Sequence, residues 1–180
     1  MLQKVLNAAQ KMTHSDRSTL WLWDRHQGNL WTTIPGQGEL RCEIGVGFVG
    51  IVAETCESMM IPFDLYKHPK AANAKKTDKQ TGYRTFSLLC TPVLGSDGKL
   101  LGVTQLVNKR KPGNFPSYQP RDKRKIPDYF KTSFNERDRR SMEIFNAQVG
   151  VILQNIQQKD LIRYEIQNRL ASKELQPTRS

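Results

Sequence analysis

Apolar residues recur at three- and four-residue steps near both ends of the chain, which is the spacing of one helix face. This pattern predicts a helix over residues 1–13 and a longer helix that begins after the N-cap residue Asn135. The apolar positions are Leu2, Val5, Leu6, Ala9 and Met12 in the first helix, and Met142, Phe145, Val149, Ile152 and Ile156 in the second. Residues beyond about 171 are expected to fray.

Between these helices, short runs rich in β-branched and aromatic residues are separated by turn residues, as strands are. The runs that predict strands are 18–24, 30–34, 40–44, 87–94 and 100–108, with a brief extended piece at 59–62. In the first run, Trp21 and Trp23 share one face and Leu20 and Leu22 the other, because successive side chains of a strand alternate. We therefore expect both faces of the sheet to be covered.

The central part of the chain predicts helices. Glycines within residues 45–50 precede an apolar run with helical period, so a helix is expected to open there and to end near Glu57. The polar segment 64–81 is expected to hold two helical turns, at 68–74 and 77–81. The order of elements predicts an α+β fold with a mainly antiparallel sheet, terminal helices on one face and central helices and loops on the other.

Composition limits the class of protein. A chain of 180 residues with 37% hydrophobic residues is long and apolar enough for one ordinary domain with flanking helices. No apolar run approaches the ~20 residues that span a bilayer, and residues 1–10 lack the core of a secretory signal. Cys42, Cys56 and Cys90 are odd in number and widely spaced, which predicts reduced thiols and a cytoplasmic location. Three scattered histidines and no CxxC pair predict no metal site.

The net charge of +11 is concentrated in one segment. Residues 109–131 hold eight basic and two acidic residues, more than half of the excess, together with four prolines. A nucleic-acid-binding face usually places basic residues along a regular element with aromatic residues between them. Because this segment has no hydrophobic period, we interpret it as a long, irregular, solvated loop. A phosphate-binding patch is the alternative, and nucleic acid is not the expected partner.

Two patterns suggest a ligand, and no catalytic constellation is visible. The glycine spacing in 45–50 resembles a dinucleotide-binding loop, but without a βαβ unit we expect only a helix start that faces a small ligand. Residues 81–85 (TGYRT) offer two hydroxyls and a guanidinium, which can bind phosphate or a purine edge. A helix C-cap at Gly82 explains that segment equally well. Gln105 lies mid-strand and needs a partner, either Thr85 or a ligand.

Several stretches together resemble a GAF domain: RSTLWLWD, GVGFVGIVAET, MMIPFDLYKHP, TGYRT and LLCTPVLGSDGKLLGVTQLVNK. The resemblance covers roughly residues 1–156. It is strongest to the cyclic-nucleotide-binding GAF domains of phosphodiesterases and bacterial adenylate cyclases. The family's Asn-Lys…Phe-x3-Asp-Glu signature is met by Asn108, Lys109, Phe134 and Asp138, with Arg139 in place of the final Glu.

The resemblance implies a six-stranded antiparallel sheet flanked by helices, a closed ligand pocket on one face, and a structural ion pair between Lys109 and Asp138. By position, the residues that would line the pocket are Thr19, Phe48, Val49, Thr81, Thr85 and Gln105. The implied ligand is cyclic AMP or cyclic GMP. No bilin is expected, because none of the cysteines precedes a histidine as in bilin-binding GAF domains.

We therefore interpret residues 1–158 as a GAF domain that includes the basic loop, and residues 159–180 as a linker helix with a frayed tail. The expected role is regulatory and not enzymatic: sensing a small molecule in a signal-transduction protein. Its output domain would be a cyclase, a histidine kinase or a response regulator of a two-component system. A homodimer through the terminal helices is expected, unless their apolar stripes only face the sheet. Two alternatives stay open: a ligand-free dimerisation and relay module, and a redox enzyme that uses Cys42 and Cys90.

Overall fold

The computed structural model describes residues 2–34, 36, 38–116, 118 and 126–174. Its strands are β1 (Ser15–Asp24), β2 (Asn29–Ile34), β3 (Gly38–Glu43), β4 (Met59–Ile61), β5 (Leu88–Leu94) and β6 (Leu100–Lys109). Its helices are α1 (Leu2–Thr13), α2 (Gly47–Thr55), α3 (Ala72–Thr81) and α4 (Glu136–Glu174), with short 3₁₀ turns at Leu65–Lys67 and Asp128–Phe130. The predicted tail beyond 174 lies outside the described residues.

The six strands form one sheet in the order β3-β2-β1-β6-β5-β4, and every neighbouring pair is antiparallel. The first and last long strands of the chain, β1 and β6, therefore lie side by side at its centre. The extended piece predicted at 59–62 is the edge strand β4. The predicted α+β class with an antiparallel sheet of six strands is confirmed.

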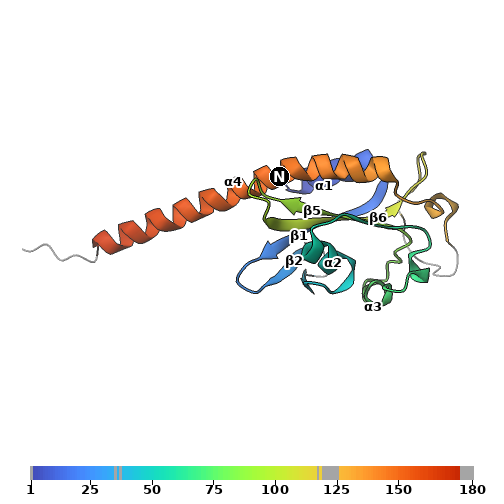
Figure 1. Cartoon of the computed structure of the whole chain (residues 1–180), viewed down its shortest axis with the longest axis horizontal. Coiled ribbons are helices and arrows are strands. Elements are labelled where there is room, and N and C mark those ends of the chain that lie inside the picture. Colours follow the sequence, from blue (N-terminus) through green and yellow to red (C-terminus); the bar gives the residue numbers. More distant parts are fainter. Residues whose placement is uncertain (1, 35, 37, 117, 119–125, 175–180) are drawn as a thin grey trace, which may run out of the picture.

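The two terminal helices cover one face of this sheet, as expected (Figure 1). Ala9 of α1 and Met142 of α4 are fully buried with Leu106 of β6. Further along α4, Val149 packs on Leu20 of β1. Helix α4 then continues well beyond the sheet (Figure 1). The apolar repeat near each end of the sequence thus belongs to a helix, and the two helices together form one layer on this face of the sheet.

The short helices α2 and α3 lie on the opposite face (Figure 1). Val52 of α2 is buried against Leu30 of β2 and Val103 of β6. Trp21 packs against this cluster, whereas Leu20 belongs to the layer under α4. The alternation predicted for the first strand is confirmed, and the molecule has three layers.

The predicted apolar stripe of α4 faces the sheet. Met142 is 0% exposed and Val149 is 2% exposed, so these two side chains are core and are not available to a partner. This is the alternative that the periodicity left open. Among the side chains of α4 that the structure describes, the exposed large apolar ones are different, namely Ile144, Val151, Leu161, Ile162 and Tyr164. A dimer through the terminal helices stays a prediction, and it would use this outer set.

Two predicted boundaries were wrong. Strand β1 begins at Ser15, three residues earlier than expected, because Ser15 pairs with Lys109 at the far end of β6. The two helical turns expected at 68–74 and 77–81 are one helix, α3, which ends at a left-handed Gly82. The local pattern is polar there, and the helix is defined by tertiary contacts of its one buried side chain, Asp78.

The interpretation of 109–131 as a solvated loop is confirmed for the exposed residues 111–114 but is wrong for the aromatic residues of the segment. Phe130 is fully buried and stacks on Phe86, at 5.2 Å between ring centroids. Tyr118 contacts the same two rings, and Phe115 stacks on Tyr129 at 4.5 Å. Irregular segments pack through aromatic anchors that have no period, so a search for periodicity cannot find them. Four of the eight basic residues of the loop, at 121–125, lie outside the described residues.

Candidate ligand-binding site

Two of the predicted site residues are direct neighbours on the central strands. Thr19 of β1 is paired with Gln105 of β6, and Gln105 is paired with Cys90 of β5. Paired residues point to the same face of an antiparallel sheet. Cys90 is buried in the cluster under α2, so this row faces α2 and not the terminal helices.

The side chain of Gln105 has a partner that the sequence did not suggest. Its Oε1 accepts a hydrogen bond from Nε1 of Trp21, at 2.8 Å. Neither the Gln105 amide nitrogen nor the Thr19 hydroxyl is hydrogen-bonded to another described residue. An amide with one end fixed keeps its N–H groups aimed in a defined direction. Gln105 is thus oriented by Trp21, and its donor end and the Thr19 hydroxyl can still bind a ligand.

Phe48 and Val49 lie at the start of α2 and are each 5% exposed. Both belong to the apolar cluster on the face that carries Gln105, and the Phe48 ring packs edge-on against His68 at 5.4 Å. The N-cap residue Val46 makes no side-chain hydrogen bond to the helix. The first amides of α2 therefore lack the side-chain acceptor that usually caps a helix.

Thr81 and Thr85 lie at the C-terminal end of α3, and both already have hydrogen bonds. Thr81 Oγ1 accepts from the Tyr83 amide at 3.3 Å. Thr85 donates twice to Asp78, from its amide at 2.7 Å and from its hydroxyl at 2.9 Å. The Thr85 hydroxyl can therefore only accept from a ligand, whereas the Thr81 hydroxyl can still donate. The expectation that Thr85 satisfies Gln105 is wrong.

Asp78 is the polar centre of this corner, and the sequence analysis missed it. Burial raises the pKa of its carboxyl above the usual value, although hydrogen bonds from Thr85 and Tyr66 oppose this. Burial and the bond to Asp78 raise the pKa of Tyr66 to about 12. The only sequence signal was one acid within a lysine-rich helix, which reads as solvated surface. Asp78 instead fixes the end of α3 against the TGYRT segment.

Two surface hollows of the described residues contain none of the six predicted site residues. One of about 460 Å³ lies between the start of α2 and residues 70–73, and its lining includes Gly47, Glu54, Lys70 and Asn73. The other, of about 750 Å³, lies on the opposite face between α4 and β5. The first adjoins Phe48 in sequence and is the nearer of the two to the expected pocket.

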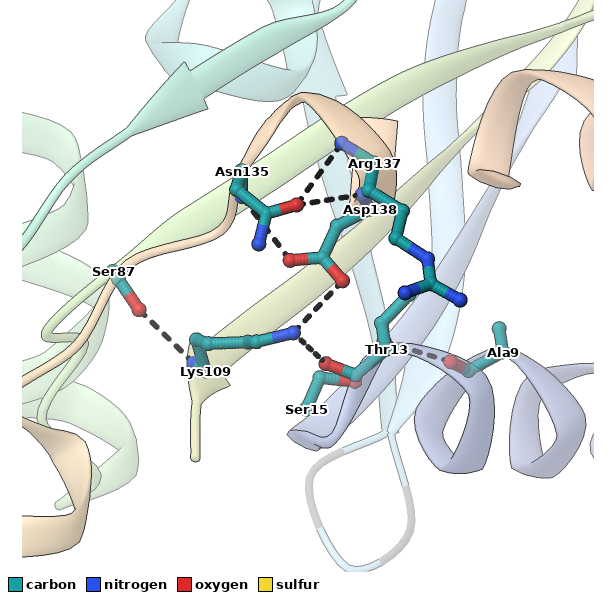
Figure 2. Close-up of polar contacts among 8 residues, drawn as sticks. All are labelled: Ala9, Thr13, Ser15, Ser87, Lys109, Asn135, Arg137 and Asp138. Carbon is teal, nitrogen blue, oxygen red and sulfur yellow. Dashed lines mark hydrogen bonds and ion pairs between the residues drawn. The ribbon is translucent and has the colours of Figure 1, made fainter. Parts of the chain in front are cut away.

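The signature residues form a separate structural anchor under the terminal helices (Figure 2). Lys109 Nζ lies 2.8 Å from Oδ1 of Asp138 and 2.7 Å from the carbonyl oxygen of Thr13. Asn135 caps α4, because its side-chain oxygen accepts from the amides of Arg137 and Asp138. The expected Lys109–Asp138 pair is present, and it joins the ends of α1 and β6 to the start of α4.

Asn108 and Phe134 complete this signature. Asn108 is fully buried; its Oδ1 accepts from the Phe86 amide at 2.6 Å and its Nδ2 donates to the Tyr83 hydroxyl at 2.9 Å. Phe134 is 7% exposed and lies 5.8 Å under the Lys109 ammonium group. Arg139, which replaces the family's Glu, pairs with acids of its own helix. All these contacts hold the fold, and none faces the α2 side.

Other chemistry is limited in the described part of the chain. No cluster of three or more His, Cys, Asp or Glu there could hold a metal ion, and no helix there is long and apolar enough to cross a membrane. Cys90 is buried, Cys42 is half-buried and Cys56 is exposed, and all three are free thiols. Burial raises the pKa of the Cys90 and Cys42 thiols, which disfavours the reactive thiolate.

Comparison with known proteins identifies the family to which this architecture corresponds. The GAF domain family model matches residues 1–153. A 168-residue stretch is 29% identical to dual 3′,5′-cyclic-AMP and -GMP phosphodiesterase 11A of Takifugu rubripes, covering 86% of this chain and 16% of that protein. A 175-residue stretch is 30% identical to the probable 3′,5′-cyclic phosphodiesterase pde-5 of Caenorhabditis elegans, covering 89% and 21%. The chain thus spans about a fifth or less of these relatives.

Among solved structures, the GAF domain of A. aeolicus nlh2 in an inactive state superposes with a TM-score of 0.59 at 14% identity, covering 87% of this chain and 83% of that one. This likeness concerns the fold alone. The family model, the six-stranded antiparallel sheet and the Lys109–Asp138 anchor agree with one another. The chain belongs to the GAF domain family.

Proposed function

We propose that this chain is the regulatory, ligand-sensing domain of a larger signalling protein in the cytoplasm, and that it binds a cyclic nucleotide without acting on it. The observation that carries this proposal is the pairing of Thr19 and Gln105 on the α2 face. Both keep hydrogen-bonding capacity that no described residue uses, in surroundings that are otherwise apolar. A purine ring with polar edges complements such a site.

The start of α2 supplies the second half of the proposed site. A helix N-terminus carries partial positive charge and free amides, which suit the charged phosphate of a cyclic nucleotide. Phe48 and Val49 would present those amides, and Val46 does not occupy them with a side chain. Thr81 would donate and Thr85 would accept at the edge of the site. The named substrates of the two phosphodiesterases, cyclic AMP and cyclic GMP, make these nucleotides the first ligands to test.

Isothermal titration of the 180-residue chain with cyclic AMP and with cyclic GMP tests the proposal. Gln105→Met keeps the length of the side chain and removes its amide, so affinity should fall about tenfold, the value of one hydrogen bond. Gln158→Met on the exposed part of α4 is the matched control and should bind like the wild type. Absence of heat with both nucleotides, or equal affinity of Gln105→Met and the wild type, contradicts the proposal.

A second candidate is a ligand-free module that dimerises and relays signals through α4. Its support is the outward set of apolar side chains on that helix, of which Ile144 is 68% exposed and Val151 is 51% exposed. An exposed apolar row along a helix is typical of a face that pairs with another helix.

Sedimentation at micromolar protein concentration tests this candidate. The wild type should sediment as a dimer and Ile144→Gln with Val151→Gln as a monomer. The monomer stability should change by less than about 0.5 kcal/mol, because both side chains are on the surface. A wild type that is strictly monomeric removes this candidate.

A further inference from the structure

Two segments of the sequence carry most of the net positive charge of this protein. Residues 64–84 hold six basic and two acidic residues, and residues 109–131 hold eight and two, so these two segments account for ten of the eleven net charges. They are far apart in sequence and adjacent in space, because Tyr118 of the second packs on Tyr83 and Phe86 at the end of the first. The described parts of the two basic segments therefore lie next to each other in the fold.

The two acids of residues 64–84 form no ion pair with the lysines of that segment. Asp78 is buried and points its carboxylate at Tyr66 and Thr85. Asp64 pairs with Arg84 at 2.9 Å. The five lysines of this segment are all exposed, and none forms an ion pair with a described residue: Lys67, Lys70, Lys75, Lys76 and Lys79. Five ammonium groups on α3 and the turn before it therefore face solvent without counter-charges.

The side chains around these lysines restrict the kind of partner. No large apolar side chain of the described parts of 64–84 and 109–131 is among the exposed ones, so a dry protein–protein interface has no anchor there. The aromatic rings at this end are used internally: Phe86 and Phe130 stack on each other, and Arg84 lies over Tyr66 and Phe86. They offer no open platform on which bases could stack.

The position of the lysines in the molecule favours a flat partner. Figure 1 places α3 and the turn at 128–130 at one end of the long axis, while the far part of α4 extends from the opposite end. Lysine carries a compact, strongly hydrated charge on a flexible stem, which suits mobile phosphate groups at a surface better than paired recognition of a base edge. An end-on contact would leave α4 directed away from the surface.

We propose that the lysines of α3 and of the turn before it form a peripheral binding site for an anionic lipid bilayer, with the phosphate and carboxylate groups of its lipids as the ligands. The contact is electrostatic, without insertion, because lysines near an anionic membrane each add about fivefold to the partition constant. It is lost at high salt, since such attraction decays within a Debye length of about 10 Å at 0.1 M.

Vesicle co-sedimentation of the whole chain tests the site. The wild type should bind vesicles of phosphatidylcholine with about 30 mol % phosphatidylserine at about 0.1 M salt, and should not bind pure phosphatidylcholine or bind at about 0.5 M salt. Replacing Lys75, Lys76 and Lys79 by Gln should lower the partition constant on the order of 100-fold. Replacing the same three by Arg should preserve binding, because the charge stays.

The matched control removes three exposed lysines elsewhere: Lys4, Lys99 and Lys159. It has the same net charge as the α3 Gln variant and should bind within about threefold of the wild type, because its charges lie away from the contact. Equal losses in the control and the α3 variant overturn the proposal, since the effect would then be one of net charge. A DNA duplex that competes the protein off the vesicles at equal phosphate concentration overturns it in favour of nucleic acid.

Discussion

The two faces of the sheet are held together by different means. On the face of α1 and α4, apolar clusters run along the helices and a nearly buried ion pair joins three elements at one point. On the face of α2 and α3, the helices are short, the half-buried Thr19 and Gln105 lie on the central strands, and the corner is fixed by the buried acid Asp78. The first face couples the terminal helices to the sheet, and on the second the Gln105 amide nitrogen and the Thr19 hydroxyl have no hydrogen-bond partner among the described residues.

The largest effect should follow from breaking the anchor on the α1 and α4 face. Asp138→Ala leaves Lys109 nearly buried with only the Thr13 carbonyl as a partner, and removes an acceptor for the Asn135 amide. Removal of one member of such a pair typically costs about 3–5 kcal/mol of unfolding free energy. Urea unfolding measures it.

Asp128→Ala is the control for this change, because Asp128 pairs with Lys111 and Lys131 in the open, where a salt bridge contributes about 0–1 kcal/mol. If Asp138→Ala costs no more than the control, the anchor does not hold the terminal helices. The hydrogen bond from Lys109 to the Thr13 carbonyl would then be sufficient to hold these helices in place.

A matched pair of glycines compares the two faces directly. A Cβ on Gly50 of α2 would collide with the carbonyl oxygen of Glu43, and one on Gly150 of α4 would collide with that of Leu94. Each change to Ala should push its helix off the sheet and cost about 1–3 kcal/mol in thermal or urea unfolding. Only Gly50→Ala should also weaken nucleotide binding in titration, since α2 carries the proposed phosphate site. Equal loss of binding in both variants would mean that the faces are not independent.

The smallest effect concerns pH and the buried acid of the α3 corner. Because burial raises the pKa of Asp78, the folded state holds its proton at a higher pH than the unfolded state does. Asp78 therefore adds stability at low pH, and this contribution is lost as the pH rises through the folded pKa. Asp78→Asn should cost about 1 kcal/mol at pH 7 through lost hydrogen bonds, and more as the pH falls toward 4.

The control for the pH dependence is Asp97→Asn on the β5–β6 turn. Lys99 lowers the pKa of Asp97, so its contribution is present at neutral pH and is lost as the pH falls. The two variants should therefore show pH trends of opposite sign in urea unfolding from pH 4 to pH 7. A cost of Asp78→Asn that shrinks toward low pH would show that hydrogen bonding outweighs burial at Asp78.

Much of the architecture was predictable because it depends on local periodicity. The apolar repeat that contains Met142 and Val149 predicted α4 but left open whether its stripe faces the sheet or a partner, and alternation in 18–24 predicted that Trp21 and Leu20 lie on opposite faces of β1. The site was less predictable. The pairing of Thr19 with Gln105 and the bond from Trp21 to Gln105 join residues more than 80 positions apart, and no local pattern carries that information.

The sequence alone determined the elements, their order and the three-layer class, because the period of apolar positions is a local property that decides which face of a helix or strand is buried. It also determined the family, through a signature of spaced residues that the structure joins at Lys109 and Asp138. Tertiary structure decided which polar residues are used. Asp78 resembles surface in sequence and is buried, and Phe130 lies in an irregular loop and is core. Tyr83, just after α3, meets Tyr118 of the basic loop only in space. Burial and pairing depend on neighbours that folding brings together, and the partner of a polar group cannot be read from its position in the chain.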